Sequence, residues 1–424
     1  MASSAHFVSS WTRPAGVVSA LTLASLVLVA PAAAQSGTTA AAGEQPTPVT
    51  TTAALIEKAP PEPQSPAQAP APAQPVEVAA PAPTNPWMRL FGPTKVSTTG
   101  DTYYAYNGNE PSSGKNVLRN FDENDNQFSG SYFEIAFEQV PTEKRRLGFR
   151  TDIGFGPTAT WVNSTDPDDG ALKYLQQAYV SVLAPVGRGL QIDVGKFNTP
   201  IGAEPTETAY NWNYSRSLLF SWAAPYYHLG MRASLPLSDT VSVSGYLING
   251  WNNAQDNNRG KTGAATVSWK VTPALTLSQA WMGGPEGPNG AAGWRNLYDT
   301  IATWTVNPRL TLMTNIDIGR DTVGGVTTAW QGIAGYGRVV VLPSWALASR
   351  FEVFEDRDGF MTGTAQTIQE ITLTSEHTIV KGLALRVEYR RDWSDEDFFE
   401  YKTDQFRPQQ NTILFGFTYA LATP

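Results

Sequence analysis

The sequence predicts an all-β fold, a single antiparallel transmembrane β-barrel of about sixteen strands. Three observations favour it: apolar and polar residues alternate along many segments, short turns alternate with longer polar loops, and aromatic residues gather where strands are expected to end. A cleaved signal peptide and a disordered Pro/Ala-rich segment are expected to precede the barrel. We therefore divide the chain into residues 1–34, 35–86 and 87–424.

The composition excludes several classes of function. The 424 residues carry 30 Lys and Arg against 38 Asp and Glu, a formal charge of −8. This balance argues against nucleic-acid binding, which needs massed basic residues. The absence of cysteine removes disulfides, thiolate metal sites, cysteine nucleophiles and lipoprotein acylation. Only three histidines are present, so a crowded catalytic centre is not expected.

The N-terminus has the pattern of a secretory signal. Arg13 precedes an apolar run over 15–30, and Ala32, Ala33 and Ala34 supply a cleavage box. The run contains Ser and Thr and is shorter than the roughly 20 apolar residues of a spanning helix. We expect cleavage after Ala34 and export of the mature chain.

Residues 35–86 are expected to be disordered. Positions 36–86 hold 12 of the 31 prolines and no aromatic residue. Such a segment buries too little apolar surface to offset the entropy of ordering. It serves either as a periplasmic spacer or as a tail without a partner. Any periplasmic partner of this linker is unknown.

Alternation with a period of two is the main signal from residue 87 onward. In residues 383–390, for example, Leu383 and Leu385 lie on one face, whereas Arg386 and Glu388 lie on the other. Successive side chains of a strand point to opposite faces, so such a strand has one apolar and one polar side. The expected strands are 95–106, 128–139, 146–156, 173–184, 189–198, 226–236, 240–250, 262–271, 274–283, 295–306, 309–320, 327–341, 344–355, 366–377, 383–393 and 410–420.

The connections favour a barrel over a soluble β-sandwich or propeller. Short turns, such as 272–273 and 307–308, alternate with generally longer polar loops, among which we include 321–326. An even strand count with this segregation is typical of outer-membrane barrels. A propeller would show a blade-length repeat, and none is found. Sixteen strands are favoured, with fourteen or eighteen possible.

Aromatic side chains at strand ends predict the girdles that mark the two membrane interfaces, where rings with a polar edge are favoured. The candidates are Tyr103, Tyr104, Tyr106, Tyr226, Tyr227, Trp281, Trp330, Trp345, Tyr389 and Trp393.

Sixteen strands enclose a lumen wide enough for water. Placing the polar faces inward puts eleven acidic and six basic side chains there, a lean toward cations. The acidic residues are Asp101, Glu134, Glu138, Asp152, Asp193, Asp299, Asp317, Glu352, Glu370, Glu376 and Glu388. The basic residues are Arg150, Arg232, Lys270, Arg350, Arg386 and Arg390.

The third long loop, 199–225, is rich in Trp, Tyr, Leu and Phe. These side chains must be buried, and the nearest place is the barrel interior. Folded inward, the loop would narrow the pore and place Glu204, Glu207 and Arg216 near the constriction, where charges act most strongly on permeating ions. The alternative is that the loop caps a subunit interface.

Four segments resemble the OmpL-like family of outer-membrane β-barrel porins, the β-barrel porin-2 type. They are GDTYYAYN at 100–107, DVGKFNTPIGAE at 193–204, YYHLGMRASLPLSDTVSVSGYLINGWNN at 226–253 and RFEVFEDRDGF at 350–360. The resemblance spans roughly residues 95–420. It implies a passive outer-membrane pore for small hydrophilic solutes in a Gram-negative-type bacterium, without cofactors or catalytic residues. Two features depart from it: the segment 36–86, and a chain that continues beyond Tyr419 instead of ending on an aromatic residue.

Other functions remain as alternatives. An enzyme on a barrel usually recruits a His base beside Ser or Asp, yet the mature chain offers only His228 and His377, far apart in sequence. We therefore expect no enzyme, metal or cofactor. A substrate-selective channel for sugars or anions and a secreted β-rich binding or adhesion protein are the remaining candidates. The expected partners are outer-membrane lipid, small hydrophilic solutes or ions and, by analogy, two further copies in a homotrimer.

Overall fold

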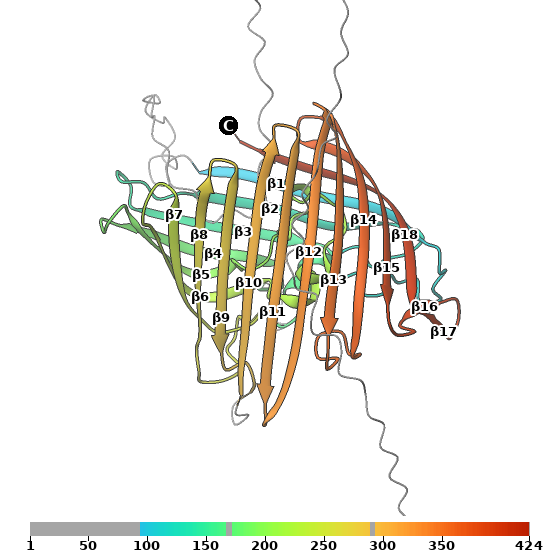
Figure 1. The fold of residues 1–424 in the computed structure, drawn as a ribbon. Coiled ribbons are helices and arrows are strands. Elements are labelled where there is room, and N and C mark those ends of the chain that lie inside the picture. Colours follow the sequence, from blue (N-terminus) through green and yellow to red (C-terminus); the bar gives the residue numbers. More distant parts are fainter. Residues whose placement is uncertain (1–93, 167–171, 289–292, 424) are drawn as a thin grey trace, which may run out of the picture. The chain divides into compact units, whose positions relative to one another are not determined.

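The computed structural model describes residues 94–166, 172–288 and 293–423. The predicted signal peptide (1–34) and Pro/Ala-rich segment (35–86) lie outside these residues. Sixteen strands form one closed antiparallel barrel, and two further short strands form a separate hairpin (Figure 1). The predicted strand count is confirmed.

Each predicted strand is present, with ends within three residues of the expected bounds. The barrel strands are β1 (Lys95–Asn107), β2 (Gln127–Gln139), β3 (Leu147–Phe155), β4 (Leu175–Ala184), β5 (Leu190–Asn198), β6 (Tyr227–Pro236), β7 (Val241–Ile248), β8 (Thr262–Thr272), β9 (Leu275–Gly284), β10 (Gly293–Asn307), β11 (Leu310–Val323), β12 (Val326–Leu342), β13 (Trp345–Asp356), β14 (Gln366–Val380), β15 (Leu383–Ser394) and β18 (Gln409–Ala422). The long-loop ends of β9, β11 and β13 point downward in Figure 1.

The ring closes between the first and last strands. β1 pairs with β2 on one side and with β18 on the other, where Gly100 lies opposite Tyr419. All other neighbouring strands of the barrel follow one another in the sequence, with only the β16–β17 hairpin between β15 and β18. Closure leaves no unpaired strand edge in the barrel, as a β-protein in lipid requires.

The outer surface of the barrel is apolar. Along β18, Ile413, Phe415 and Phe417 are exposed, whereas Thr412 and Leu414 are buried on the other face. The same alternation holds along β14, where Leu373 is exposed between buried Thr372 and Thr374. Exposed apolar bands of this kind suit contact with hydrocarbon.

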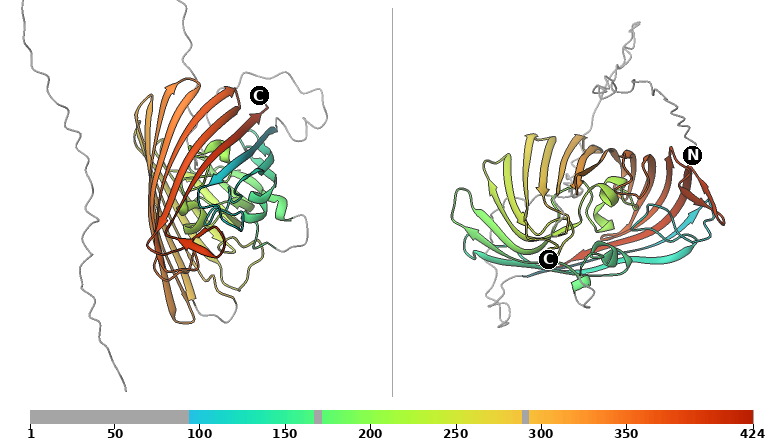
Figure 2. Two further views of the ribbon diagram at one scale, coloured as in Figure 1. Left: turned by 90° about the vertical axis from the view of Figure 1, so that its right-hand side faces the viewer. Right: turned by 90° about the horizontal axis from the view of Figure 1, so that it is seen from below.

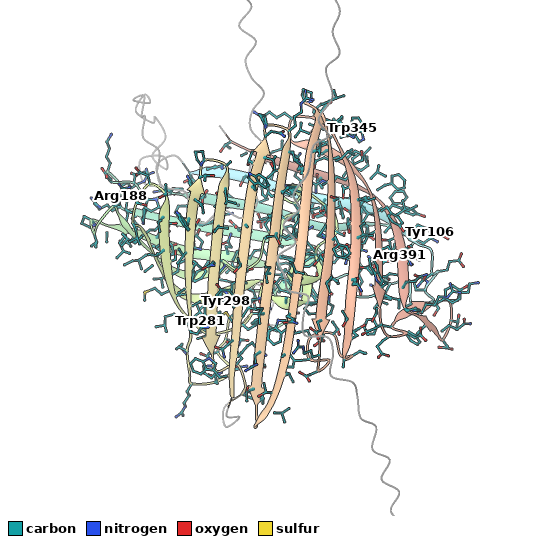
Figure 3. The ribbon with its side chains drawn as sticks, in the orientation of Figure 1. Tyr106, Arg188, Trp281, Tyr298, Trp345 and Arg391 are labelled. Carbon is teal, nitrogen blue, oxygen red and sulfur yellow. The ribbon has the colours of Figure 1, made fainter. Side chains whose placement is uncertain are left out.

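Four of the ten predicted girdle residues are wrong. Tyr103, Tyr226, Tyr227 and Trp330 are buried, so they cannot lie at a lipid interface. Trp330 belongs to the inward face of β12, where its ring lies over Gly319 of the neighbouring strand. The remaining candidates are on the outward side or half-exposed; Figure 3 shows Trp281 near the long-loop end and Trp345 near the turn end.

The connections carry structure that the sequence did not indicate. Loop 321–326 was expected to be long, but β11 and β12 extend to a tight turn at Gly324 and Gly325, both with positive φ. The last long loop contains the hairpin of β16 (Phe399–Tyr401) and β17 (Gln405–Arg407). The second contains α2 (Pro157–Val162) and the 3-10 turn η1 (Leu172–Tyr174). No helix in the described residues is long and apolar enough to cross a membrane.

Outward and inward positions should differ in their tolerance of charge. We expect Leu373→Arg, which faces outward in the middle of β14, to destabilise the barrel by about 2–4 kcal/mol, because the guanidinium would enter hydrocarbon. Thr378→Arg, on the inward face of the same strand and exposed, is the control and should change stability little. Urea unfolding of the protein in lipid vesicles measures both, and equal stabilities would contradict the assignment of faces.

Candidate functional site

The third long loop, residues 199–226 (loop 3), lies inside the barrel. It connects β5 to β6 and contains the 3-10 turn η2 (Thr208–Tyr210) and the π-helical turn η3 (Leu219–Ala223). Figure 2, which looks along the barrel in its right-hand view, shows a helical turn within the ring of strands. Nearly all of the loop is buried; Tyr210, at 40% exposed, is the main exception.

Apolar packing holds one side of the loop. Leu218, Leu219 and Ala223 join a buried cluster with inward-facing residues of β8–β14, including Phe354 and Ile368. The long-loop half of the interior is therefore a hydrophobic core, whereas the sequence predicted polar inward faces throughout. Glycines supply the space: a side chain at Gly332 would collide with Leu219, and one at Gly416 with Tyr214.

Arg350 of β13 is the centre of the polar contacts. Its guanidinium donates to the backbone oxygens of Ser215 and Arg216 at 2.8 and 3.2 Å. It also forms ion pairs with Glu204 of the loop at 2.9 Å, and with Glu352 and Glu370 of the wall at 2.8 Å each. Because an uncompensated charge inside a protein is costly, this cluster holds together as a unit.

Two arginines of β15 repeat this pattern. Arg386 donates to the backbone oxygens of Thr208 and Asn211 at 2.8 and 2.7 Å, and pairs with Glu376 at 2.6 Å. Arg390 donates to the backbone oxygen of Arg216 at 2.5 Å and pairs with Asp392 at 2.7 Å. Three wall arginines thus satisfy carbonyl groups of loop 3 that water cannot reach.

Wall carboxylates satisfy the loop's donors in turn. Glu388 of β15 accepts the N–H groups of Tyr214 and Ser215 at 2.6 and 2.9 Å. Asp101 of β1 accepts hydrogen bonds from the hydroxyls of Tyr214 and Thr208, both at 2.7 Å. Loop 3, which begins at the end of β5, is therefore bound to β15 across the barrel and to β1, which lies between β5 and β15 around the ring.

Loop 1, between β1 and β2, closes over the same region. Arg119 is buried, forms an ion pair with Asp122, and lies 3.5 Å from Asp392 of β15. Burial alone would lower the pKa of Arg119, but the two carboxylates outweigh it and raise the pKa above its ordinary value. Trp222 of loop 3 donates to the backbone oxygen of Leu118 at 3.2 Å.

The three residues predicted for the constriction occupy different environments. Glu204 is buried, pairs with Arg350 and accepts the N–H of Ser217 at 2.8 Å. Arg216 is buried and donates to Tyr214 O and Thr208 Oγ1 within its own loop. Glu207 has neither kind of contact: among the described residues, no ion pair and no hydrogen bond involves its carboxylate. The three do not converge on one point of the interior.

The predicted lumen charges of β2–β6 lie on the part of the wall from which loop 3 originates. The arginines there pair with carboxylates of the wall. Arg150 pairs with Asp152 at 2.9 Å, and Arg232 pairs with Asp193 at 2.6 Å. Glu134 accepts the hydroxyl of Tyr132 at 2.6 Å. The guanidinium of Arg232 also lies 5.0 Å from the ring centre of Tyr179.

Asp317 of β11 and Asp299 of β10 are buried register partners beneath the start of loop 3. Asn315 Nδ2 donates to Asp299 at 2.6 Å, and its Oδ1 accepts the N–H of Ala203 at 3.0 Å. Asn315 therefore connects Asp299 of the wall to the backbone of loop 3.

The histidines form no catalytic arrangement. His228 is buried, with Nε2 3.0 Å from Thr199 Oγ1 and Nδ1 3.0 Å from the backbone oxygen of Gly250. His377 is exposed on the outward face, stacked on Trp345. Within residues 94–166, 172–288 and 293–423, no group of acidic and histidine side chains is arranged to hold a metal ion.

The fold is that of outer-membrane porins. The anion-selective porin of Comamonas acidovorans is 12% identical, with a TM-score of 0.54 over 78% of this chain and 99% of that chain. OmpT of Vibrio cholerae in its trimer form is 11% identical, with a TM-score of 0.52 over 78% and 100% of the two chains. OmpF of Salmonella typhi, in complex with daunomycin, is 12% identical, with a TM-score of 0.52 over 78% and 97%. These identities establish the fold alone, and no curated protein sequence matched the chain.

The family is established by sequence. The profile of the family described as "Putative beta-barrel porin-2, OmpL-like" matches residues 93–421, and the chain belongs to this family. The resemblance expected from the sequence is confirmed, and with it a porin-type barrel of the outer membrane.

Removal of Arg350 should release loop 3. We expect Arg350→Met to destabilise the folded barrel by about 3–5 kcal/mol, because it leaves buried carboxylates without a cation. The loop should then become open to proteolysis within 199–226. Arg338→Met is the control, because Arg338 is partly exposed and its partner Glu376 keeps Arg386. Limited proteolysis with mass spectrometry reads out both, and an intact loop 3 in Arg350→Met would contradict the anchoring role.

Proposed function

We propose that the protein is a porin, a water-filled channel for passive diffusion of small hydrophilic solutes and ions, narrowed by loop 3. The observation that carries the proposal is the attachment of this loop across the barrel interior. Its backbone oxygens bind Arg350, Arg386 and Arg390 on the far wall. A loop fixed in this way reduces the cross-section without depending on flexible contacts.

The turn-end half of the interior supports a wet passage. On the side of loop 3 nearer the short turns, the inward faces of β7 and β8 carry hydroxyl residues that are all half-exposed: Ser242, Ser244, Thr266 and Ser268. Hydroxyl groups on a strand face that points away from lipid are suited to water. Most of the apolar core lies toward the long-loop ends of the strands, where the loops pack, although it includes Met313 and Tyr336 nearer the turns.

The charges divide into anchors and pore-facing groups. Glu204 and Arg216, predicted at the constriction, are held in contacts of loop 3, and only Glu207 is free of such contacts among the described residues. We assign to Arg350, Glu352, Arg386, Glu388 and Arg390 the role of holding loop 3 against the wall. Asp317 lies on the wall near the start of the loop. The remaining proposed lumen-lining charges are Glu134, Arg150, Asp152, Asp193 and Arg232; among them Arg150 and Arg232 are partly exposed, whereas the three carboxylates are buried.

The alternatives are less well supported. A secreted binding or adhesion protein would pack its apolar faces together, whereas Phe415 and Leu373 are exposed on the outer wall. No arrangement in the described residues supports catalysis or a cofactor. A homotrimer is proposed because one structural neighbour is a trimer form. Outer-membrane lipid and hydrophilic solutes are the proposed partners, after export by the predicted signal peptide.

Deletion of residues 206–220 tests the constriction directly. The variant should form channels of larger single-channel conductance in planar bilayers, because it removes most of loop 3 from the interior. Heat-dependent migration on SDS gels confirms that the variant still folds into a closed barrel. An unchanged conductance in a folded variant would place the constriction elsewhere, and a wild-type protein that forms no channels would reject the porin proposal.

A further inference from the structure

The outward face of the barrel wall is almost free of charge, with two arginines as the main exceptions. On the described strands β8–β15 and β18, the charged residues of this face are Arg320, Glu355 and Arg391. Glu355 already has partners, because it accepts hydrogen bonds from Arg357 at 2.9 Å and from Gln331 at 2.6 Å. Neither Arg320 nor Arg391 forms an ion pair within the described residues.

The two arginines lie at the same level of the wall. Each is exposed and is followed by three more residues of its strand before the long-loop end, Arg320 in β11 and Arg391 in β15. Outer-membrane barrels carry their long loops on the extracellular side, so both side chains lie toward the outer leaflet. The next outward residues toward the membrane centre are Ile318 and Tyr389, which are also exposed. Each guanidinium therefore adjoins the apolar band of the wall.

Arg391 lies in a groove of about 430 Å³ on the outer surface of β14, β15 and β18. Its guanidinium donates a hydrogen bond to Gln409 and lies 6.0 Å from the ring centre of Trp393. The strand register places Ile371 of β14 opposite Arg391. Ser394 and Pro408 complete the lining. Among the described residues no acidic side chain lines this groove, so its guanidinium is the only charge that it offers.

A second groove, of about 400 Å³, surrounds Arg320 on β9–β12. The register sets Trp281, Tyr298 and Ile318 next to one another along one rung of the sheet, with both rings exposed (Figure 3). Arg357 adds a second guanidinium to the lining. Arg320 itself makes no hydrogen bond within the described residues. This groove thus repeats the features of the first: a guanidinium without a carboxylate partner, an aromatic ring and an apolar floor.

The acidic groups nearest to the second groove have other partners. Glu355 binds Arg357, and Asp358 accepts the N–H of Ala329 at 2.9 Å. Neither carboxylate belongs to the lining. The charged side chains that line both grooves are therefore cationic, and an anion is the complementary ligand.

A phosphate group on a lipid matches this combination of features. The fork of a guanidinium binds phosphate oxygens through two parallel hydrogen bonds. A cation on a lipid-facing surface is costly unless it reaches a polar partner, and headgroups supply such partners at the edge of the hydrocarbon. The isoleucines and aromatic rings beside each arginine offer apolar surface to acyl chains. A free anion would make no use of that surface.

We propose that Arg391 and Arg320 each hold the phosphate group of an outer-leaflet lipid, whose acyl chains lie along the apolar wall. The ligand class is a phosphorylated lipid, and the two grooves are separate sites for it. This role is distinct from conduction, because both grooves lie on the outside of the barrel.

Two lipids that differ only in the phosphate test the proposal. Full-length protein in detergent micelles is mixed with dioleoyl phosphatidic acid or with dioleoylglycerol, and bound lipid is counted by native mass spectrometry. We expect two molecules of phosphatidic acid to be retained, with affinity at least about tenfold above that for dioleoylglycerol, as a hydrogen bond to a charged group provides. Arg391→Gln and Arg320→Gln should each lose one of the two, and the double variant should lose the preference for phosphate.

The control is Arg188→Gln, which removes the same charge from the turn end of the barrel, where Arg188 pairs with Asp239. This variant should bind phosphatidic acid as the wild type does. Heat-dependent migration on SDS gels confirms that each variant is a closed barrel.

Four results would overturn the proposal. They are equal binding of the two lipids, a wild-type preference in the folded double variant, and displacement of phosphatidic acid by inorganic phosphate, which would identify sites for free anions. The fourth is loss of oligomeric state in a folded variant, which would assign the grooves to contacts between subunits. None of these results bears on conductance, so the porin proposal would stand.

Discussion

A chain that enters the interior of a barrel must bring partners for its backbone polar groups, and this constraint governs the whole arrangement. Loop 3 has little regular structure, so most of its N–H and C=O groups cannot pair with one another. The wall supplies the partners: arginines of β13 and β15 bind its carbonyls, and Glu388 binds its N–H groups. Where the wall is apolar, the loop presents Leu and Ala instead.

Because loop 3 makes its charged contacts with β13 and β15, the charges on the two sides of the barrel interior have different partners. Buried ion pairs contribute little net stability compared with apolar packing, but they are costly to break and hence fix geometry. The arginines on β13 and β15 are held by loop 3 and by neighbouring carboxylates, so their charges are balanced locally. On the wall of β2 and β3, Glu134 and Asp152 are also buried, and Arg150, which pairs with Asp152, is partly exposed. The position of loop 3 therefore determines which of the inward charges are paired with groups of the loop.

The fold could be predicted because its physical basis is local. Alternation along a strand is visible within ten residues, and it predicted all sixteen barrel strands. Errors arose where the sequence is locally ambiguous: Tyr227 and Trp330 lie in strands, and their exposure depends on which face turns inward. The turn at Gly324 and Gly325 was overlooked because polar residues around it continue the strands.

The candidate site was predictable only in part. The apolar composition of loop 199–225 indicated that it must be buried and favoured the barrel interior, but it left a subunit interface as the alternative. The roles of its charges did not follow, since Glu204 and Arg350 are separated by 146 positions and meet only through the closed barrel. Asp101 and Tyr214, which join β1 to the loop, likewise show no pattern in the sequence.

The most direct test of the account uses the absence of native cysteines. We replace Ala209, which precedes the exposed Tyr210 of loop 3, with a single cysteine. A water-soluble, positively charged thiol reagent is then added during single-channel recordings. If this side of the loop lines the conducting path, each modification lowers the current in a discrete step. A current that stays constant while mass spectrometry shows complete labelling would contradict the account.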